Sequence, residues 1–489
     1  MNEKKRYHPA IILFNIASFI KENFFLIIIL FVINIGSTSK WIVWGRYALI
    51  ALFFVYILYS ILKWYIETYE ITREAFIFRD GVIIKNQRNI PFERIQDHHS
   101  KTNFLHQLLG ITSLKLETGT SDKDANIAFP AISLQEEARI LESLLKKERK
   151  IEVDAQHEEE RAVYFESTNK DTIKAAFTSF SFLALFPLLL TGYFQLDEWL
   201  NIEETSKQVL HYFERNMWIW IPLGLVTLAA AFAVGYLQTL FKYGNFVISA
   251  DKDRIYITRG VFTTNAYSIQ KSRVQAIKIQ QSLLKRIFGM VEIKLVSAGQ
   301  EIIGSETEVN SLYPFMDKKR AYQLVNQLLP DYHIVENMHR LPKKILWLKL
   351  IRPYYFTLAA IIILSFVKRE WLYAAAIVLL AEVIFRLLDY QFTSYLQEEE
   401  YIQVREGGLF TRTIHTKWRN LQQIEVSHTW LQRRFGVTTI QFYNRAKPFQ
   451  LTILMDLSKE EAVAFYERFC RRSAKTRLLR NENEANFIE

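Results

Sequence analysis

At 489 residues, the chain is long enough for two to four ordinary domains. Its single cysteine, Cys470, excludes an intramolecular disulfide framework. The net charge of +10 suits either a nucleic acid or an anionic membrane surface. Because the hydrophobic residues are gathered into blocks, the membrane is the simpler partner.

The first hydrophobic region contains three apolar stretches. A helix needs about 20 mostly apolar residues to cross a bilayer, and neither Ala10–Ile20 nor Phe24–Ile35 is that long. We interpret Ala10–Ile20 as an amphipathic helix in the membrane plane and Phe24–Ile35 as a short span. Trp44–Tyr65 is a full-length span, so the two spans form a first transmembrane hairpin.

Four further apolar blocks pair into two more hairpins. Ala175–Phe194 and Met217–Phe241 form the second hairpin, and Tyr354–Val367 and Trp371–Leu388 form the third. The sequence therefore predicts six spans. Lysine and arginine residues next to these spans are biased toward one side. That bias predicts that both termini and three large soluble segments are cytoplasmic, at the cell membrane.

The three soluble segments carry the same ordered signals, which indicates an internal repeat. RDG, TRG and REG each end in a glycine, and a second glycine follows 29 residues later in every segment. A glutamine lies 14 residues before that second glycine. The repeated glycines are Gly81, Gly110, Gly260, Gly289, Gly407 and Gly436, and the repeated glutamines are Gln96, Gln275 and Gln422.

Each copy has the pattern of a small antiparallel β unit that ends in one amphipathic helix. The first glycine suits a hairpin turn that needs positive φ, because alternating runs such as IYITRGVFTT surround it. The stretch SLLKRIFG predicts a short helix with Ser282 as N-cap and Gly289 as C-cap. The closing helices are predicted at Leu134–Arg149, Lys318–Leu329 and Ser458–Arg472.

These motifs resemble the bacterial membrane-anchored PH-like domain family. That family joins a transmembrane hairpin to a PH-like domain with an I-P-x-x-R-I-Q stretch, and the first copy has IPFERIQ. The second copy lacks the proline, and the third has Asn420 where the arginine is expected. The resemblance implies a seven-stranded β-barrel-like sandwich with a capping helix, and no catalytic activity. It also implies a membrane complex with a smaller single-domain PH-like partner and, more loosely, a role in envelope stress or antimicrobial-peptide tolerance.

The predicted fold class is therefore a multi-pass α-helical membrane protein with three α+β PH-like domains, each an antiparallel β-barrel or sandwich plus a C-terminal capping helix. Hairpins and domains alternate along the chain. The predicted boundaries are 1–65 for the in-plane helix and first hairpin, 66–170 for domain 1, 171–241 for the second hairpin, 242–340 for domain 2, 341–388 for the third hairpin with its preceding basic segment, and 389–489 for domain 3.

The sequence predicts no enzyme, because it lacks a phosphate-binding loop, a zinc-protease motif, a nucleophile elbow and paired CxxC motifs. His98, His99 and His106 are close in sequence, but adjacent strand residues point to opposite faces, which suits a metal poorly. We expect neither a metal nor another cofactor. The repeated motifs also supply candidate contacts to a ligand or partner, for which we favour a structural role common to the copies. They are Arg94, Gln96, Arg273, Gln275 and Gln422.

Charged residues near the apolar blocks leave two alternatives open. The clusters Lys343–Lys344, Arg433–Arg434 and Arg471–Arg472 either contact anionic lipid headgroups or form solvated faces. Glu382 and Arg386, one helical turn apart, are either a relay pair or a salt bridge, and we favour the bridge. Nucleic-acid binding is not expected, since no basic stripe with stacking aromatic residues is present. We therefore expect a membrane scaffold that presents three binding domains, with a small-solute or peptide transporter as the alternative.

Overall fold

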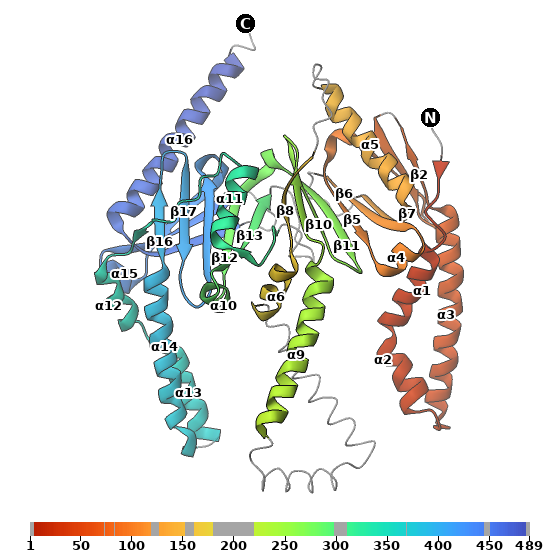
Figure 1. Cartoon of the computed structure of the whole chain (residues 1–489), viewed down its shortest axis with the longest axis horizontal. Coiled ribbons are helices and arrows are strands. Elements are labelled where there is room, and N and C mark those ends of the chain that lie inside the picture. Colours follow the sequence, from red (N-terminus) through yellow and green to blue (C-terminus); the bar gives the residue numbers. More distant parts are fainter. Residues whose placement is uncertain are drawn as a thin grey trace. The chain divides into compact units, whose positions relative to one another are not determined.

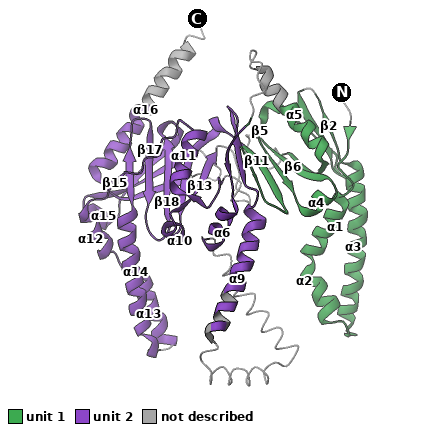
Figure 2. Cartoon of the chain, in the orientation of Figure 1, with its two compact units in different colours: residues 1–161, 256–268 green, residues 162–255, 269–489 purple. Residues whose placement is uncertain are grey.

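The structure is a computed structural model (Figure 1), and it describes residues 4–485 apart from 73, 83, 119–126, 152–160, 179–219, 298–310, 368 and 445–449. The chain forms two compact units (Figure 2). Unit 1 holds Met1–Arg161 and Tyr256–Ser268, and unit 2 holds Ala162–Ile255 and Ile269–Glu489. The second repeat therefore contributes one part of its strands to unit 1 and the other part to unit 2.

In unit 1 the first repeat folds into two antiparallel sheets around one core. The first sheet has the order β1-β2-β3-β4, and the second runs from β7 through β6 and β5 to β11 and β10 of the second repeat. Alternating apolar residues meet in the core, where Phe76, Leu114 and Phe129 are completely buried. The strands are β1 (Lys4–Lys5), β2 (Thr68–Ile71), β3 (Ala75–Asp80), β4 (Asn86–Pro91), β5 (Ile95–Thr102), β6 (Ile111–Thr118), β7 (Ile127–Ser133), β10 (Arg254–Arg259) and β11 (Thr264–Gln270).

The N-terminal helices of unit 1 pack against one another and against this core. Tyr7 and Ile11 belong to the same apolar cluster as the strands, and the indole Nε1 of Trp64 donates to the carbonyl of Tyr7 at 2.8 Å. Strand β1 pairs with β2, so the start of the chain is joined to the first repeat. The helices are α1 (Ile11–Glu22), α2 (Phe24–Ile27), a π-helix (Ile28–Ile33) and α3 (Lys40–Ile66).

In unit 2 one antiparallel sheet of seven strands spans the second and third repeats. Its order is β14-β13-β12-β18-β17-β16-β15, and β19-β20-β21 form a separate sheet. Trp418, Phe442 and Phe465 fill the core of the third repeat. The strands are β8 (Ala162–Glu166), β9 (Val247–Ala250), β12 (Val274–Gln281), β13 (Met290–Ser297), β14 (Met316–Asp317), β15 (His339–Arg340), β16 (Ser394–Gln397), β17 (Tyr401–Glu406), β18 (Thr411–Lys417), β19 (Leu421–Ser427), β20 (Val437–Asn444) and β21 (Gln450–Ser458).

Consecutive repeats are thus joined by strand pairing. We call the pairing of β5 with β11 the first junction and the pairing of β12 with β18 the second junction. The three predicted closing helices are confirmed as α5 (Leu134–Ile151), α11 (Lys318–Leu328) and α16 (Lys459–Ala485). Helix α11 buries residues at three- and four-residue steps, as the apolar pattern predicts: Ala321, Leu324, Val325 and Leu328.

The prediction of a multi-pass α-helical membrane protein with six spans is wrong. Within the described ranges, only Lys40–Ile66 and Lys343–Val367 are long and apolar enough to cross a membrane. A third span is added if Ile11–Glu22 and Phe24–Ile33, which are bent by 64° at their break, are counted as one. The chain is instead a mixed α and β protein whose sheets carry the cores.

Charge and packing characterise two helices of the segment predicted as the third hairpin with its preceding basic segment. The last block forms α14 (Tyr373–Phe392), which carries Glu382, Arg386 and Asp389 within its length. Helix α12 (Lys343–Ile351), which precedes α13 (Tyr355–Val367), uses its apolar residues in the core of the third repeat. Most of the predicted second hairpin lies outside the described residues, between α6 (Asn169–Thr178) and α9 (Trp220–Tyr243).

Candidate membrane-facing site at the repeat junctions

Each repeat carries one short helix between two strands of its second sheet. These helices are α4 (Phe104–Leu108), α10 (Leu283–Ile287) and α15 (Trp430–Arg434). The predicted N-cap of α10 is confirmed, because the Ser282 hydroxyl accepts a hydrogen bond from the backbone N–H of Lys285 at 3.3 Å. The glycines that follow the helices have φ values of 63–67°, which end each helix in a left-handed residue: Gly110, Gly289 and Gly436.

The first glycine of the third repeat departs from the predicted turn role. Gly81 and Gly260 have positive φ, whereas in the third repeat the neighbouring Gly408 has it, at 133°. A Cβ on Gly407 would lie 2.6 Å from the carbonyl oxygen of Asp389 and 2.6 Å from the backbone nitrogen of Thr393. Gly407 therefore lets the end of α14 approach the β17–β18 hairpin closely.

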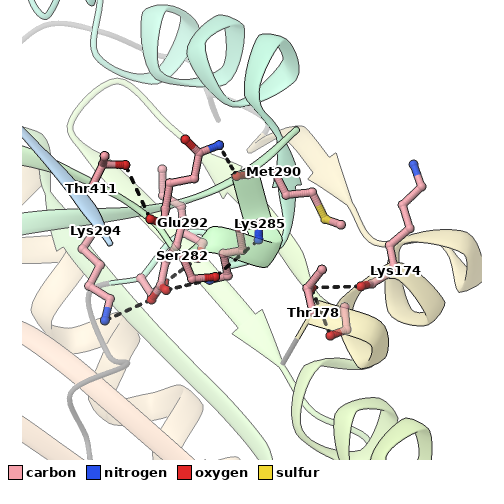
Figure 3. A network of polar contacts seen from close by, with 12 residues as sticks. Lys174, Thr178, Ser282, Lys285, Met290, Glu292, Lys294 and Thr411 are labelled. Carbon is pink, nitrogen blue, oxygen red and sulfur yellow. Dashed lines mark hydrogen bonds and ion pairs between the residues drawn. The ribbon is translucent and has the colours of Figure 1, made fainter. Parts of the chain in front are cut away.

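The third residue of each short helix is a buried polar residue: His106, Lys285 or Gln432. In α10 the Lys285 ammonium lies 2.9 Å from a carboxylate oxygen of Glu292, and Lys294 lies 3.0 Å from the other oxygen (Figure 3). Burial alone would raise the pKa of Glu292, but the two lysines hold it below its ordinary value. Glu292 therefore stays charged and keeps both lysines in place.

The outer faces of the short helices expose large apolar side chains. Phe104 and Leu108 of α4 are 56% and 74% exposed, and Ile287 of α10 is 68% exposed. Trp430, the first residue of α15, is 80% exposed. Apolar residues that recur on the same element of three copies mark an interaction surface rather than scattered exposure.

The hairpin of the following repeat adds to this apolar surface at each junction. Phe262, in the β10–β11 turn, contacts Phe104 with ring centroids 6.1 Å apart. Phe410, in the β17–β18 turn, is 73% exposed and lies beside Ser282 at the edge of a cavity. Each junction therefore presents a short helix together with the hairpin tip of the next repeat.

Two of the short helices contact the apolar helices of their own unit. In unit 1, the ring of His106 lies 4.5 Å from that of Phe14 in α1. In unit 2, the Arg286 guanidinium lies 3.9 Å from the ring centre of Phe392 at the end of α14, and it donates to the carbonyl of Gly408 at 3.2 Å. These contacts place α4 and α10 beside the ends of the helices that carry the apolar blocks.

Helix α15 reaches the break between α12 and α13 through a buried acid. The side chain of Gln432 donates to Asp456 Oδ1 at 2.9 Å, and the Arg352 guanidinium donates to the same oxygen. Asp456 is completely buried and has a φ of 64°. The short helix of the third repeat is thus linked through one carboxylate to the start of α13.

A cavity of about 410 Å³ opens at the second junction, beside α10 and the β17–β18 hairpin. Burial, together with Arg412 and Lys294 nearby, lowers the pKa of Lys278 to about 8. The Lys285 ammonium lies 2.9 Å from Glu292 and the Arg412 guanidinium lies 3.8 Å from Glu406, so both cations of the lining are paired. The charged residues that line the cavity are Lys285, Glu292, Glu406 and Arg412.

The candidate contact residues from the repeated motif belong to both units: Arg94 and Gln96 to unit 1, and Arg273, Gln275 and Gln422 to unit 2. Each motif forms a 3₁₀ turn and then enters a strand with a β-bulge at the glutamine: Gln96, Gln275 or Gln422. Arg94 is exposed at the end of its turn, and the Arg273 Nε donates to Gln270 at 2.7 Å. None of these residues lines the cavity at the second junction.

The departure of the third copy from the motif has a structural reason. Asn420 stands where an arginine is expected, and its side chain donates to the carbonyl of Gln275 at 2.8 Å. The same carbonyl accepts a hydrogen bond from the hydroxyl of Thr416 at 2.8 Å. Asn420 therefore holds the second junction together, a role that only the three-dimensional pairing of the repeats makes visible.

The Glu382–Arg386 pair binds the break between α12 and α13. Arg386 donates to the carbonyls of Lys349, Arg352 and Pro353, and it lies 3.0 Å from Glu382. Glu382 accepts from the hydroxyl and the backbone N–H of Thr357 at 2.9 and 3.3 Å. Both side chains are thus occupied in joining α14 to the preceding helices.

The remaining charged candidates lie apart. Lys343, Lys344, Arg433 and Arg434 are exposed. The described residues hold no group of three or more histidine, cysteine or acidic side chains that suits a metal ion. His98 and His99 lie in β5, whereas His106 lies in α4, where burial first and Lys101 second lower its pKa.

A family model of the bacterial PH domain matches residues 12–148, 200–331 and 354–472. The chain belongs to the bacterial PH domain family. The three matches follow the three repeats, and the family predicted from the motifs is confirmed. This bacterial PH domain protein is also 26% identical over 481 residues to YdbT of Bacillus subtilis (strain 168), described as a UPF0699 transmembrane protein. That alignment covers 94% of this chain and 97% of YdbT, and no solved structure matches.

Proposed function

We propose that this protein is a non-enzymatic membrane scaffold whose PH domains lie on the cytoplasmic surface of the cell membrane. It is a membrane-associated PH-domain protein, as its family, its apolar helices and its relative YdbT indicate. The observation that carries the finer proposal is the exposed apolar residues on the short helix of each repeat. Headgroup contact would cover them in each unit.

The chemistry of the short helices supports contact with the headgroup region. Burying one side chain such as Trp430 or Ile287 stabilises the docked state by about 1.5–3 kcal/mol. Each lysine or arginine near an anionic surface adds about 1 kcal/mol, and Arg433 and Arg434 are exposed beside Trp430.

Lipid contact is tested with spin labels on the full chain in liposomes that contain anionic lipid. In a Cys470→Ser background, a label at Ile287→Cys should be accessible to oxygen dissolved in the bilayer. A label at Val163→Cys, also an exposed apolar residue at 62% but on strand β8, serves as the matched control. Equal access of a water-soluble paramagnet to both labels would contradict headgroup contact.

Orientation is tested with the natural cysteine. Cys470 is exposed on α16 and is the single thiol of the chain. A membrane-impermeant maleimide should label Cys470 in lysed cells and leave it unlabelled in intact cells. Labelling of intact cells would place the third repeat outside the cytoplasm and end this proposal. The pairing of β1 with β2 supports a common side for the N-terminus and the first repeat.

The single-domain PH-like partner and the link to envelope stress or antimicrobial peptides remain predictions of the resemblance. Capture of the tagged full chain in mild detergent should recover a smaller PH-domain protein in fixed ratio if the partner exists. The transporter alternative is weakened, because Glu382 and Arg386 bind backbone groups at a helix break.

A further inference from the structure

The two junctions between repeats have the same register. In the first junction Tyr267 of β11 lies opposite His99 of β5. In the second junction Ile414 of β18 lies opposite Lys278 of β12. Counted from the repeated glutamine, these are equivalent positions in successive copies, so each junction is built by one rule. The strand after the bulge accepts the strand that precedes the bulge in the next repeat.

By that rule, one strand that follows a bulge (β19) and one strand that precedes a bulge (β4) are not paired with a strand of another repeat among the described residues. In the part of the chain that the structure describes, β19 of the third repeat is the end strand of its sheet, and so is β4 of the first repeat. Strand β19 corresponds to β5 and β12, and β4 corresponds to β11 and β18. Edge strands with open backbone groups are templates for another strand.

The exposure of equivalent residues shows what an occupied junction covers. Ile279 of β12 is 4% exposed beneath β18, whereas Val426, the equivalent residue of β19, is 40% exposed. Gln422, Gln423 and Glu425 of β19 are also exposed. The third repeat therefore has the apolar and backbone features of a junction, with no further strand on β19 among the described residues.

Transferring the register to these two strands gives a complementary charge pair. The position of Lys278 corresponds to Glu425 in β19, and the position of Ile414 corresponds to Arg88 in β4. Arg88 lies 2.7 Å from Asp80, and 40% of its side chain stays exposed. Glu425 opposite Arg88 would extend this ion pair across the new junction, and opposite charges at facing positions favour strand pairing.

We propose that a second copy of this chain docks its β4 strand on β19, in the register that places Arg88 opposite Glu425. The contact joins unlike surfaces of two identical chains, so it is heterologous and repeats from copy to copy. This self-association goes beyond the proposed scaffold role. If it is not found, the results of the Cys470 labelling and of the Ile287 spin-label test are unaffected.

Disulfide cross-linking of the full chain in detergent tests the register. Two differently tagged Cys470→Ser proteins, one with Arg88→Cys and one with Glu425→Cys, are mixed and oxidised with copper phenanthroline. A mixed dimer should form, because facing side chains of paired strands are about 5 Å apart at Cβ. The matched control replaces Arg88→Cys by Asn89→Cys, whose side chain points to the other face of β4, and should give much less mixed dimer.

Charge exchange tests the same pairing without a cross-link. Glu425→Arg should weaken self-association by about fivefold, and adding Arg88→Glu to the same chain should restore it. Rescue by the double variant shows that Glu425→Arg weakens association through its charge and not by disrupting the fold. Absence of a mixed dimer with both cysteine positions overturns the proposal. Cross-linking of Glu425→Cys only to a smaller co-purified protein overturns it as well, since a different partner then occupies β19.

Discussion

Asp456 is a completely buried carboxylate that joins the third repeat to the apolar helices. Its Oδ1 accepts from Arg352 and Gln432, and its Oδ2 has no hydrogen-bond partner among the described residues. Arg352 keeps 31% of its side chain exposed, so water screens the guanidinium but not the carboxylate. Loss of the guanidinium therefore leaves the carboxylate charge unscreened, whereas loss of the carboxylate leaves a guanidinium that water still screens.

That asymmetry predicts unequal costs for removing each partner. Arg352→Gln leaves a fully buried charge without its ion pair, which costs about 3–5 kcal/mol of unfolding free energy. Asp456→Asn leaves a partly hydrated guanidinium and keeps a side chain that tolerates positive φ, so we expect about 1–2 kcal/mol. The double variant should lose less than the sum of the two single losses, because the interaction is already absent in each.

Urea unfolding of the full chain in detergent, followed by tryptophan fluorescence, measures these losses. Trp418 lies in the core of the third repeat and reports its unfolding. Arg471→Gln is the control, since the ion pair of Arg471 with Glu467 is highly exposed and should contribute less than about 0.5 kcal/mol. A larger loss for Asp456→Asn than for Arg352→Gln, or strictly additive losses, would refute the reasoning.

Three further perturbations test the packing of unit 2. His415 is completely buried, and burial lowers its pKa to about 3. The free energy of unfolding should therefore fall by about 1.4 kcal/mol per pH unit as the pH drops below about 6.5. His415→Gln should reduce this slope in urea titrations at pH 7.5 and 5. Gly407→Ala places a methyl group 2.6 Å from backbone atoms at the end of α14, so it should cost about 1–3 kcal/mol in thermal unfolding, whereas Gly36→Ala, with open space around it, should not. Arg386→Ala should expose the helix break to limited proteolysis, and an unchanged cleavage pattern would argue against its joining role.

The elements of each repeat were predictable because local signals specify them. Ser282 caps α10, and the closing helix α11 follows the apolar spacing of Ala321, Leu324 and Val325. Because each signal occurs in three copies at constant spacing, a chance match was improbable and the repeat could be identified. The short helix α10 was recognised by its caps, Ser282 and Gly289. The exposed apolar residues of the short helices, such as Trp430, were not singled out, although their recurrence in three copies was a usable signal.

The partners of the strands and the number of spans were not predictable in the same way. Alternation identifies a strand and its buried face, but not which repeat supplies its neighbour, so the pairing of β5 with β11 required the structure. Hydropathy likewise counts apolar residues without showing where they pack. Helix α14, predicted as a span, carries Glu382, Arg386 and Asp389, and these residues join it to the preceding helices.

The bulge at the repeated glutamine explains why the motif and the junction occur together. A bulge leaves one residue of the strand outside the regular ladder, so its backbone groups are available to a further partner. At Gln275 that partner is the third repeat, since Thr416 and Asn420 both donate to the carbonyl. The bulge of β19 is built in the same way at Gln422, and there the structure describes no following repeat. The third repeat thus carries the same bulged motif that receives a strand at Gln275.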